Sequence, residues 1–123
     1  MINPAAGPGS MPSIEPAEIT LDLEHLGRMT LGDRHLEREV LQLFDRQTAM
    51  IADRLRGAPA ALATSCAHTL KGSARGIGAW RLASVAADVE RSAASAGADI
   101  AAAVEQLIGA VAETRAAIAR HLD

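Results

Sequence analysis

The sequence predicts an all-α protein: an antiparallel, up-and-down four-helix bundle with a short extra helix on its N-terminal side. After Thr20, apolar residues recur at steps of three and four almost throughout. Glycine or proline interrupts this pattern at intervals that leave only short connections, which favours antiparallel neighbours. Hydrophobic residues make up 49% of the chain and aromatic residues only 2%, a composition that suits closely packed helices better than sheets.

The length and charge of the chain narrow the class of protein. Its 123 residues indicate one domain, large enough to hold a core without metals or disulfides. The single cysteine, Cys66, excludes an internal disulfide. The formal net charge is -3 with both signs well mixed, and no apolar run could cross a bilayer or serve as a secretory signal. We therefore expect a cytoplasmic protein that binds neither nucleic acid nor membrane.

The first 18 residues differ in composition from the rest. Residues 1–18 contain four of the five prolines, and such a segment buries too little apolar surface to offset its ordering entropy. We expect a flexible leader over 1–18 and the bundle over 19–123. The stretch from Gly7 to Met11 also resembles a cloning remnant before a second start methionine.

The short extra helix is predicted over 22–30. Asp22 can cap its N-terminus, and Leu23 and Leu26 should face inward. Gly32 and Asp33 then end this helix and start the next one.

The next two helices are bounded by glycine and proline. The helix that follows Asp33 stops at Gly57 and carries one apolar stripe. The residues of this stripe are Leu36, Val40, Leu43, Phe44, Gln47, Ile51 and Leu55. Pro59 suits the first position of the third helix, which should run to about Arg75. Gly76-Ile77-Gly78 then resembles a C-terminal cap with a glycine in the left-handed conformation.

Two further helices complete the bundle. One covers about 79–95 and ends at Gly97, and its inward residues are Leu82, Val85, Ala86 and Val89. The last one has apolar residues at Ile100, Val104, Leu107, Ile108, Val111, Ile118 and Leu122. Because the bundle accounts for one apolar stripe on each helix, we expect a monomer.

The third helix carries the candidate site. At about 100° per residue, its inward group comprises Leu62, Cys66, Leu70, Ser73 and Ile77. His68 points the opposite way, and Thr64, Lys71 and Arg75 share its side of the helix. The two cations would lie where an anionic group on the imidazole would sit, so this arrangement could carry a phosphate in the open.

Gly72 strengthens this hypothesis. A glycine inside a helix costs about 0.5–1 kcal/mol relative to alanine, so its use in an alanine-rich chain needs a reason. One reason is access for a bulky partner to His68. Another is close packing of two helices, and an exposed histidine is usually an ordinary surface residue. The residues alone leave both explanations open, and no other histidine has comparable neighbours.

The segment around His68 reads Ala67-His68-Thr69-Leu70-Lys71-Gly72-Ser73-Ala74-Arg75-Gly76-Ile77-Gly78-Ala79. It closely resembles the signature of the histidine-containing phosphotransfer (HPt) domains of bacterial two-component phosphorelays. The likeness covers about 20–122, with Leu21-Asp22-Leu23 as the family's opening, Phe44 as a common aromatic and Val89-Glu90 in the following helix.

The resemblance implies a role for each matching residue. His68 would be phosphorylated on Nε2, Lys71 would contact the phosphoryl oxygens, and Gly72 would give the partner room. Arg75 is added as a second phosphoryl-contacting residue, on helical geometry alone. Ser73 matches the signature, but its inward angle predicts helix or core contacts, and Thr64 would support the helix.

The resemblance also implies the partners. The chain would shuttle a phosphoryl group between receiver-domain aspartates of response regulators and an upstream hybrid histidine kinase. It has no phosphate-binding loop for ATP, so kinase activity of its own is not expected. No cofactor is expected either, because the receiver would supply Mg²⁺. Docking should involve the third helix and parts of 22–30 and 33–45, through an apolar patch with a polar rim.

Four alternatives compete with this prediction. The dimerisation domain of a sensor kinase usually has an acidic residue after its histidine, where this chain has Thr69. A phosphotransfer fragment of a larger hybrid or chemotaxis kinase stays open, as does a non-catalytic helical adaptor in which His68 has no role. A metal-binding bundle is disfavoured, because no Glu-x-x-His spacing occurs.

Overall fold

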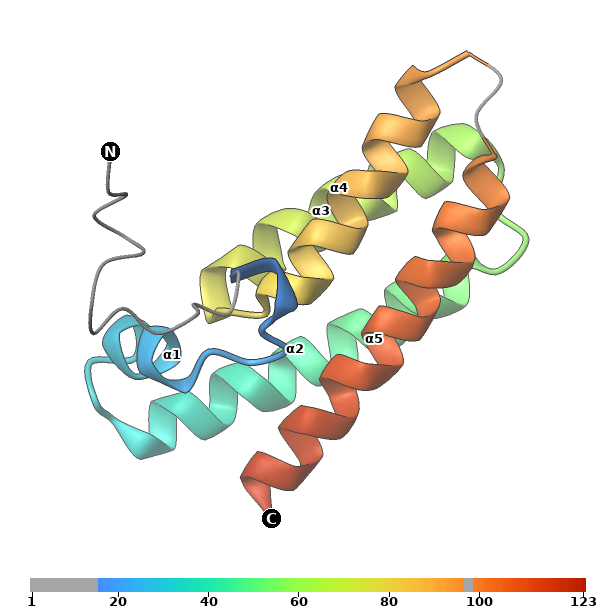
Figure 1. Ribbon diagram of the computed structural model, residues 1–123. Helices are drawn as coiled ribbons and strands as arrows, with labels where there is room; N and C mark the ends of the chain where they lie inside the picture. The colour runs from blue at the N-terminus through green and yellow to red at the C-terminus, as the bar shows by residue number, and fades with distance from the viewer. Residues whose placement is uncertain (1–15, 97–98) are drawn as a thin grey trace, which may run out of the picture.

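The computed structural model describes residues 16–96 and 99–123, which form helices and no strands (Figure 1). The elements are a short 3-10 helix η2 (Pro16–Glu18), α1 (Leu23–Met29), α2 (Arg34–Leu55), α3 (Ala60–Ile77), α4 (Trp80–Ala94) and α5 (Ile100–Leu122). The predicted fold class, four long helices with a short one before them, is therefore confirmed.

The four long helices pack in a closed ring. The neighbouring pairs are α2 with α3, α3 with α4, α4 with α5, and α5 with α2. The short helix α1 packs against α3, and it lies at the end of the bundle where α2 begins (Figure 1). None of the helices in the described ranges has both the length and the hydropathy that a bilayer span requires.

Aliphatic side chains fill the core. The largest fully buried ones are Leu26, Leu41, Leu55, Leu70, Leu82, Leu107 and Ile118. The contact between α3 and α4 is the most extensive, and both helices present buried alanines, including Ala63, Ala67 and Ala86. Small side chains let the two backbones approach closely, which places the outer faces of α3 and α4 next to each other.

Aspartates begin three of the helices, as their sequence positions indicate. Asp22 accepts a hydrogen bond from the backbone N–H of His25 at 3.0 Å, and Asp33 accepts one from Leu36 at 3.0 Å. Asp99 caps α5 in the same way. Each such cap is worth about 1 kcal/mol, since it satisfies a backbone donor that the helix leaves unpaired.

Several predicted boundaries shift by one or two residues. Pro59 is the N-cap of α3 and not its first helical residue, and α3 continues to Ile77, so Gly76 is still helical. Gly78 alone takes the left-handed conformation, with φ +84°. The predicted leader was too long, because η2 (Pro16–Glu18) is helical and contacts α4. Residues 1–15 and Gly97 lie outside the described residues.

The predicted inward face of α2 was only partly right: Phe44 and Leu55 are buried, and Val40 and Ile51 pack against the core. The buried residues are Leu41, Phe44, Thr48, Ala52 and Leu55. Leu36, Leu43 and Gln47 are exposed instead. Helix α2 carries two stripes at steps of three and four, and the core uses the one that includes a threonine and an alanine. The Thr48 hydroxyl is buried at low cost because it donates to the Asp45 carbonyl at 3.1 Å.

Two other leucines were also placed on the wrong side. Leu23 is exposed because α1 buries Leu26 alone, and Leu62 is exposed because α3 buries Ala63 in its place. The predicted burial of Cys66 is confirmed. Close helix packing selects a small residue here over a larger apolar neighbour.

Candidate functional site

The outward face of α3 presents His68, whose side chain is 72% exposed. Its neighbours Cys66, Ala67 and Leu70 are buried, so the helix is fixed while the imidazole stands in solvent. The predicted outward direction of His68 is therefore confirmed.

A carboxylate from the next helix contacts the imidazole. Glu90 of α4 places Oε2 at 3.1 Å from His68 Nδ1 and Oε1 at 2.7 Å from the Nζ atom of Lys71. The side chains of Glu90 and Lys71 are mostly covered, at 25% and 21% exposure. One carboxylate thus bridges the histidine and the lysine that the sequence placed in the candidate site.

The ionisation of Glu90 determines which nitrogen of the His68 ring carries the hydrogen. The Lys71 ammonium, and then the His68 ring, hold the pKa of Glu90 below its usual range. Glu90 is therefore an ionised carboxylate at neutral pH, and an ionised carboxylate can only accept hydrogen bonds. The hydrogen must then be on His68 Nδ1, which leaves the lone pair of a neutral ring on Nε2.

Two other histidines contact carboxylates, but through the opposite ring nitrogen. His35 places Nε2 at 2.9 Å from Glu39, and His121 places Nε2 at 3.1 Å from Glu37. In both residues the acid contacts Nε2, the ring nitrogen farther from the backbone. In His68 the acid contacts Nδ1 instead.

The fourth histidine is excluded by burial. Nε2 of His25 is buried and has no hydrogen-bond partner within the described residues, and the ring packs edge-on against Trp80 at 4.9 Å between centroids. Only His68 therefore combines an anchored Nδ1 with an Nε2 that a partner molecule can reach.

Gly72 lies one turn after His68, and the fold does not need a glycine there. A Cβ atom built at this position finds no heavy atom within 4 Å, and the residue is exposed. The explanation by close packing of two helices is therefore wrong for Gly72. The absent side chain clears space only on the outside of the molecule, next to the imidazole.

The other predicted site residues are more peripheral. Arg75 is exposed on the same face, two turns and about 10 Å along the axis from His68. The Thr64 hydroxyl donates to the Ala60 carbonyl at 2.8 Å, so it is occupied by its own helix. Ser73 is half-buried and lines a groove between α2 and α3.

Sequence reasoning missed Glu90 as a site residue, although a signal existed. Helices α3 and α4 are joined by a tight turn at Gly78 and Ala79. His68 lies eleven residues before Ala79 and Glu90 lies eleven residues after it. In an antiparallel pair, residues equidistant from the turn lie at the same level, so this spacing could have placed Glu90 beside His68.

Metal ligands do not gather in the described part of the chain. No group of three or more His, Cys, Asp or Glu side chains suited to a metal ion occurs in residues 16–96 or 99–123. Among these described residues, Glu90 is the one acid that contacts His68, and it is already paired with Lys71.

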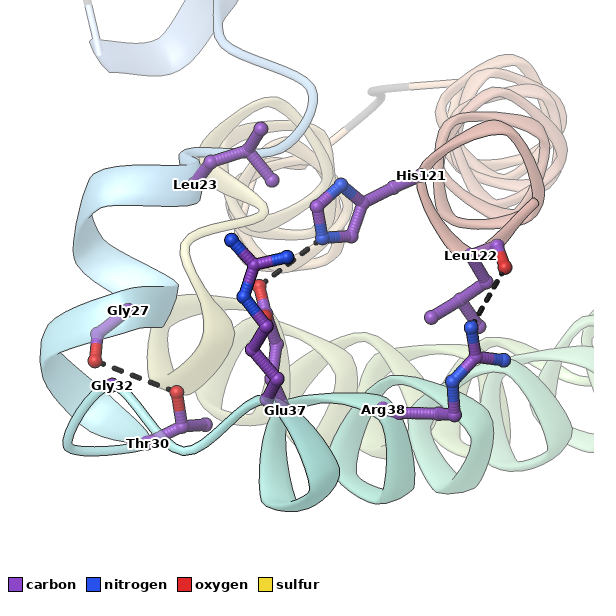
Figure 2. Close-up of a pocket in the computed structure, with 9 residues that line it drawn as sticks. Leu23, Gly27, Thr30, Gly32, Glu37, Arg38, His121 and Leu122 are labelled. Atoms are coloured by element: carbon purple, nitrogen blue, oxygen red, sulfur yellow. Dashed lines mark hydrogen bonds and ion pairs between the residues drawn. The ribbon is translucent and has the colours of Figure 1, made fainter.

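A separate cavity of about 440 Å³ lies between α1, α2 and α5 (Figure 2). At its rim His121 contacts Glu37, and the Arg38 guanidinium donates to the Leu122 carbonyl at 2.9 Å. None of the residues around His68 lines it. These contacts tie the end of α5 to the start of α2.

Comparison with known families agrees with this site. A family model described as Hpt domain matches residues 39–117, more than half of the chain. The chain therefore belongs to the Hpt domain family. Members of this family act in phosphotransfer within phosphorelays, where they interact with receiver domains and histidine kinases. Comparisons with curated proteins and with solved structures gave no match.

Proposed function

We propose that this protein is a phosphocarrier that receives a phosphoryl group on Nε2 of His68 and passes it to an aspartate of a receiver domain. The observation that carries the proposal is the selective arrangement of His68. It alone among the four histidines has Nδ1 held by a carboxylate and Nε2 open to a partner.

The transfer would be an in-line displacement at phosphorus. The Nε2 lone pair forms the N–P bond while the bond from phosphorus to the aspartyl oxygen breaks, and the aspartate leaves as a carboxylate. The hydrogen on Nδ1 stays in place, so the ring gains positive charge as the bond forms. Glu90 faces that charge at 3.1 Å and would stabilise it, as the aspartate of a catalytic triad stabilises an imidazolium.

Lys71, Gly72 and Arg75 would serve the phosphoryl group and its carrier. An ammonium has three donors and Glu90 engages Lys71 on one side, so Lys71 can still donate to a phosphoryl oxygen. Gly72 leaves space for the partner's approach. Arg75 is expected to neutralise charge at the edge of the complex, because it lies two turns from the imidazole.

The partner would supply the remaining groups. We infer that a receiver domain brings the aspartate and Mg²⁺, and that an upstream hybrid histidine kinase loads the pathway in the cytoplasm. Positioning and charge neutralisation then dominate the catalysis, since the carrier itself adds little covalent chemistry.

The test is chemical phosphorylation followed by discharge. Wild type and His68→Gln are incubated with phosphoramidate, and both are examined by intact mass. We expect one acid-labile phosphoryl group on the wild type, none on the variant, and its disappearance when a receiver domain and Mg²⁺ are added.

His35 provides a matched control, since it is also exposed and also contacts a carboxylate. His35→Gln should load and discharge like the wild type. If His68→Gln loads as well as the wild type, or if no receiver from a panel discharges the loaded protein, the carrier proposal is wrong. A non-catalytic adaptor would then be the better description.

A further inference from the structure

Helix α2 has a second apolar face that its own bundle does not cover. Leu36, Leu43 and Met50 follow one another at seven-residue intervals, and they are 38%, 49% and 57% exposed. Val40, which is partly buried, and the exposed Gln47 lie between them. We call these five residues the α2 seam.

The spacing of the α2 seam is that of a coiled coil. Its steps are four, three, four and three, which is the alternation of a and d positions in a heptad. Exposed apolar residues that are scattered singly are normal, but a row along a helix of 22 residues, about 33 Å long, is not. The expectation of a monomer assumed one apolar stripe on each helix, and α2 has two.

We propose that the α2 seam binds the α2 seam of a second copy of this chain, with the two helices antiparallel. Charges next to the seam favour this occupant. The g positions beside it are Glu39, Arg46 and Asp53. In antiparallel pairs g faces g′, and the register that sets Val40 against Leu43 of the second copy brings Glu39 against Arg46, twice by symmetry.

Both members of that charge pair are available. Arg46 is exposed, and none of the ion pairs among the described residues uses it. Within the described ranges Glu39 forms an ion pair only with His35, and the side chains of this pair are well exposed and can exchange partners at little cost.

A parallel pair would not gain this complementarity. There g faces e′, and the e positions of α2 are Glu37, Phe44 and Ile51. Phe44 is buried in its own core and Glu37 already contacts His121. The antiparallel arrangement is therefore the one that the charges support.

A groove beside the seam offers room for the second helix. A cavity of about 250 Å³ between α2 and α3 is lined by residues that include Gln47, Met50, Thr69 and Ser73. Side chains of a helix on the α2 seam can enter it. Because Thr69 follows His68 directly, the dimer would lie next to the phosphorylation site and compete with a receiver for that face.

The test is the oligomeric state of the whole chain, measured by sedimentation velocity over a wide range of concentrations. We expect a reversible monomer–dimer equilibrium. Leu43→Glu should weaken it about tenfold or more, because a seam leucine is lost and a charge is placed near the two-fold axis. Leu23→Glu is the matched control: this leucine has the same 49% exposure on α1 and should leave the equilibrium unchanged.

Charge reversal tests the register. Glu39→Arg and Arg46→Glu should each weaken the dimer, and the double variant should restore it, which loss of packing would not produce. A wild type that stays monomeric at every concentration overturns the proposal. If, in addition, Leu43→Glu then weakens binding of a receiver domain, the α2 seam belongs to the receiver. Neither result depends on His68, so the phosphocarrier proposal is judged separately.

Discussion

Two clusters of similar composition lie along helix α3, and each has a carboxylate, a histidine and a glycine. Only one of the two clusters presents its histidine to solvent. The first is the open site in the middle of the helix, where Glu90 holds His68. The second is an anchor at its end, where Asp22 joins α1 to the turn after α3.

The anchor is held by hydrogen bonds and a ring contact within the protein. Asp22 accepts hydrogen bonds from the backbone N–H of His25 at 3.0 Å and from Trp80 Nε1 at 2.9 Å, and its own N–H donates to the Gly78 carbonyl at 2.9 Å. These bonds hold its pKa below the usual value, the His25 N–H first and then the indole. The His25 ring packs on Trp80, with Nε2 buried.

The comparison shows which feature marks a reactive site. Both carboxylates have lowered pKa values, so a perturbed pKa alone does not separate function from structure here. The two clusters differ in whether a histidine ring nitrogen remains available to a partner molecule. In the anchor both carboxylate oxygens of Asp22 are engaged and Nε2 of His25 is buried, whereas in the open site the His68 side chain is 72% exposed and its Nε2 is left to a partner.

The largest effect on stability is expected at the glycine of the anchor. Gly78→Ala should lower the free energy of unfolding by about 2 kcal/mol or more, because φ is +84° and a Cβ would lie 3.0 Å from both Cβ and the carbonyl oxygen of Asp22. Thermal unfolding followed by circular dichroism measures this. A variant as stable as the wild type would show that α1 is not held as described.

The next effect concerns the rate of phosphorylation. Glu90→Gln removes the charge that faces the imidazole and the strict preference for a hydrogen on Nδ1, so loading of His68 should slow about tenfold or more. Its melting temperature should change little, because the contact is near the surface. Asp22→Asn is the counterpart in the anchor and should do the opposite, lowering stability with little effect on loading.

Acid should weaken the anchor more than the open site, because the contact of Glu90 is near the surface. A carboxyl whose pKa is lower in the folded than in the unfolded state stabilises the fold at a pH above its unfolded-state pKa. That contribution is lost as the pH falls through its folded-state pKa. Stability should therefore drop as the pH falls below about 4, the ordinary range of Asp and Glu. Urea unfolding at several pH values measures this, and the drop should be shallower in Asp22→Asn. An equal slope in the two proteins would contradict the role given to Asp22.

The smallest effect on stability is expected at the glycine of the open site, and it is a gain in stability where Gly78→Ala gives a loss. Gly72→Ala should raise the free energy of unfolding by about 0.5–1 kcal/mol, because nothing opposes a Cβ there and alanine favours the helix. Transfer from a receiver should nevertheless become slower. A variant that is both more stable and equally fast would remove the argument from access.

The sequence was sufficient where local chemistry decides. Asp22 and Asp33 cap their helices and Gly78 ends α3 because capping depends on neighbouring residues alone. The outward direction of His68 followed from helical geometry. Glu90 was missed because its role depends on a contact between two helices, and spacing about a turn is a weaker signal than a motif.

The orientation of α2 shows the other limit. Its two stripes have the same spacing, and the predicted inward face mixed residues of both: Phe44 is buried, whereas Leu36 and Leu43 are exposed. The bundle instead buries Thr48 and Ala52, because a small residue or a self-satisfied hydroxyl fits closely packed helices. Hydropathy ranks the stripes by composition, whereas packing ranks them by volume, and the two criteria disagree on this helix.

The central claim is that Glu90 holds the hydrogen on Nδ1 of His68 and leaves Nε2 as the acceptor of the phosphoryl group. A long-range ¹H–¹⁵N correlation spectrum of the imidazole, recorded before and after treatment with phosphoramidate, tests it directly. We predict that the neutral ring of His68 carries its hydrogen on Nδ1, and that phosphorus is on Nε2 afterwards. A neutral ring with its hydrogen on Nε2 before treatment, or phosphorus on Nδ1 after it, would contradict the account.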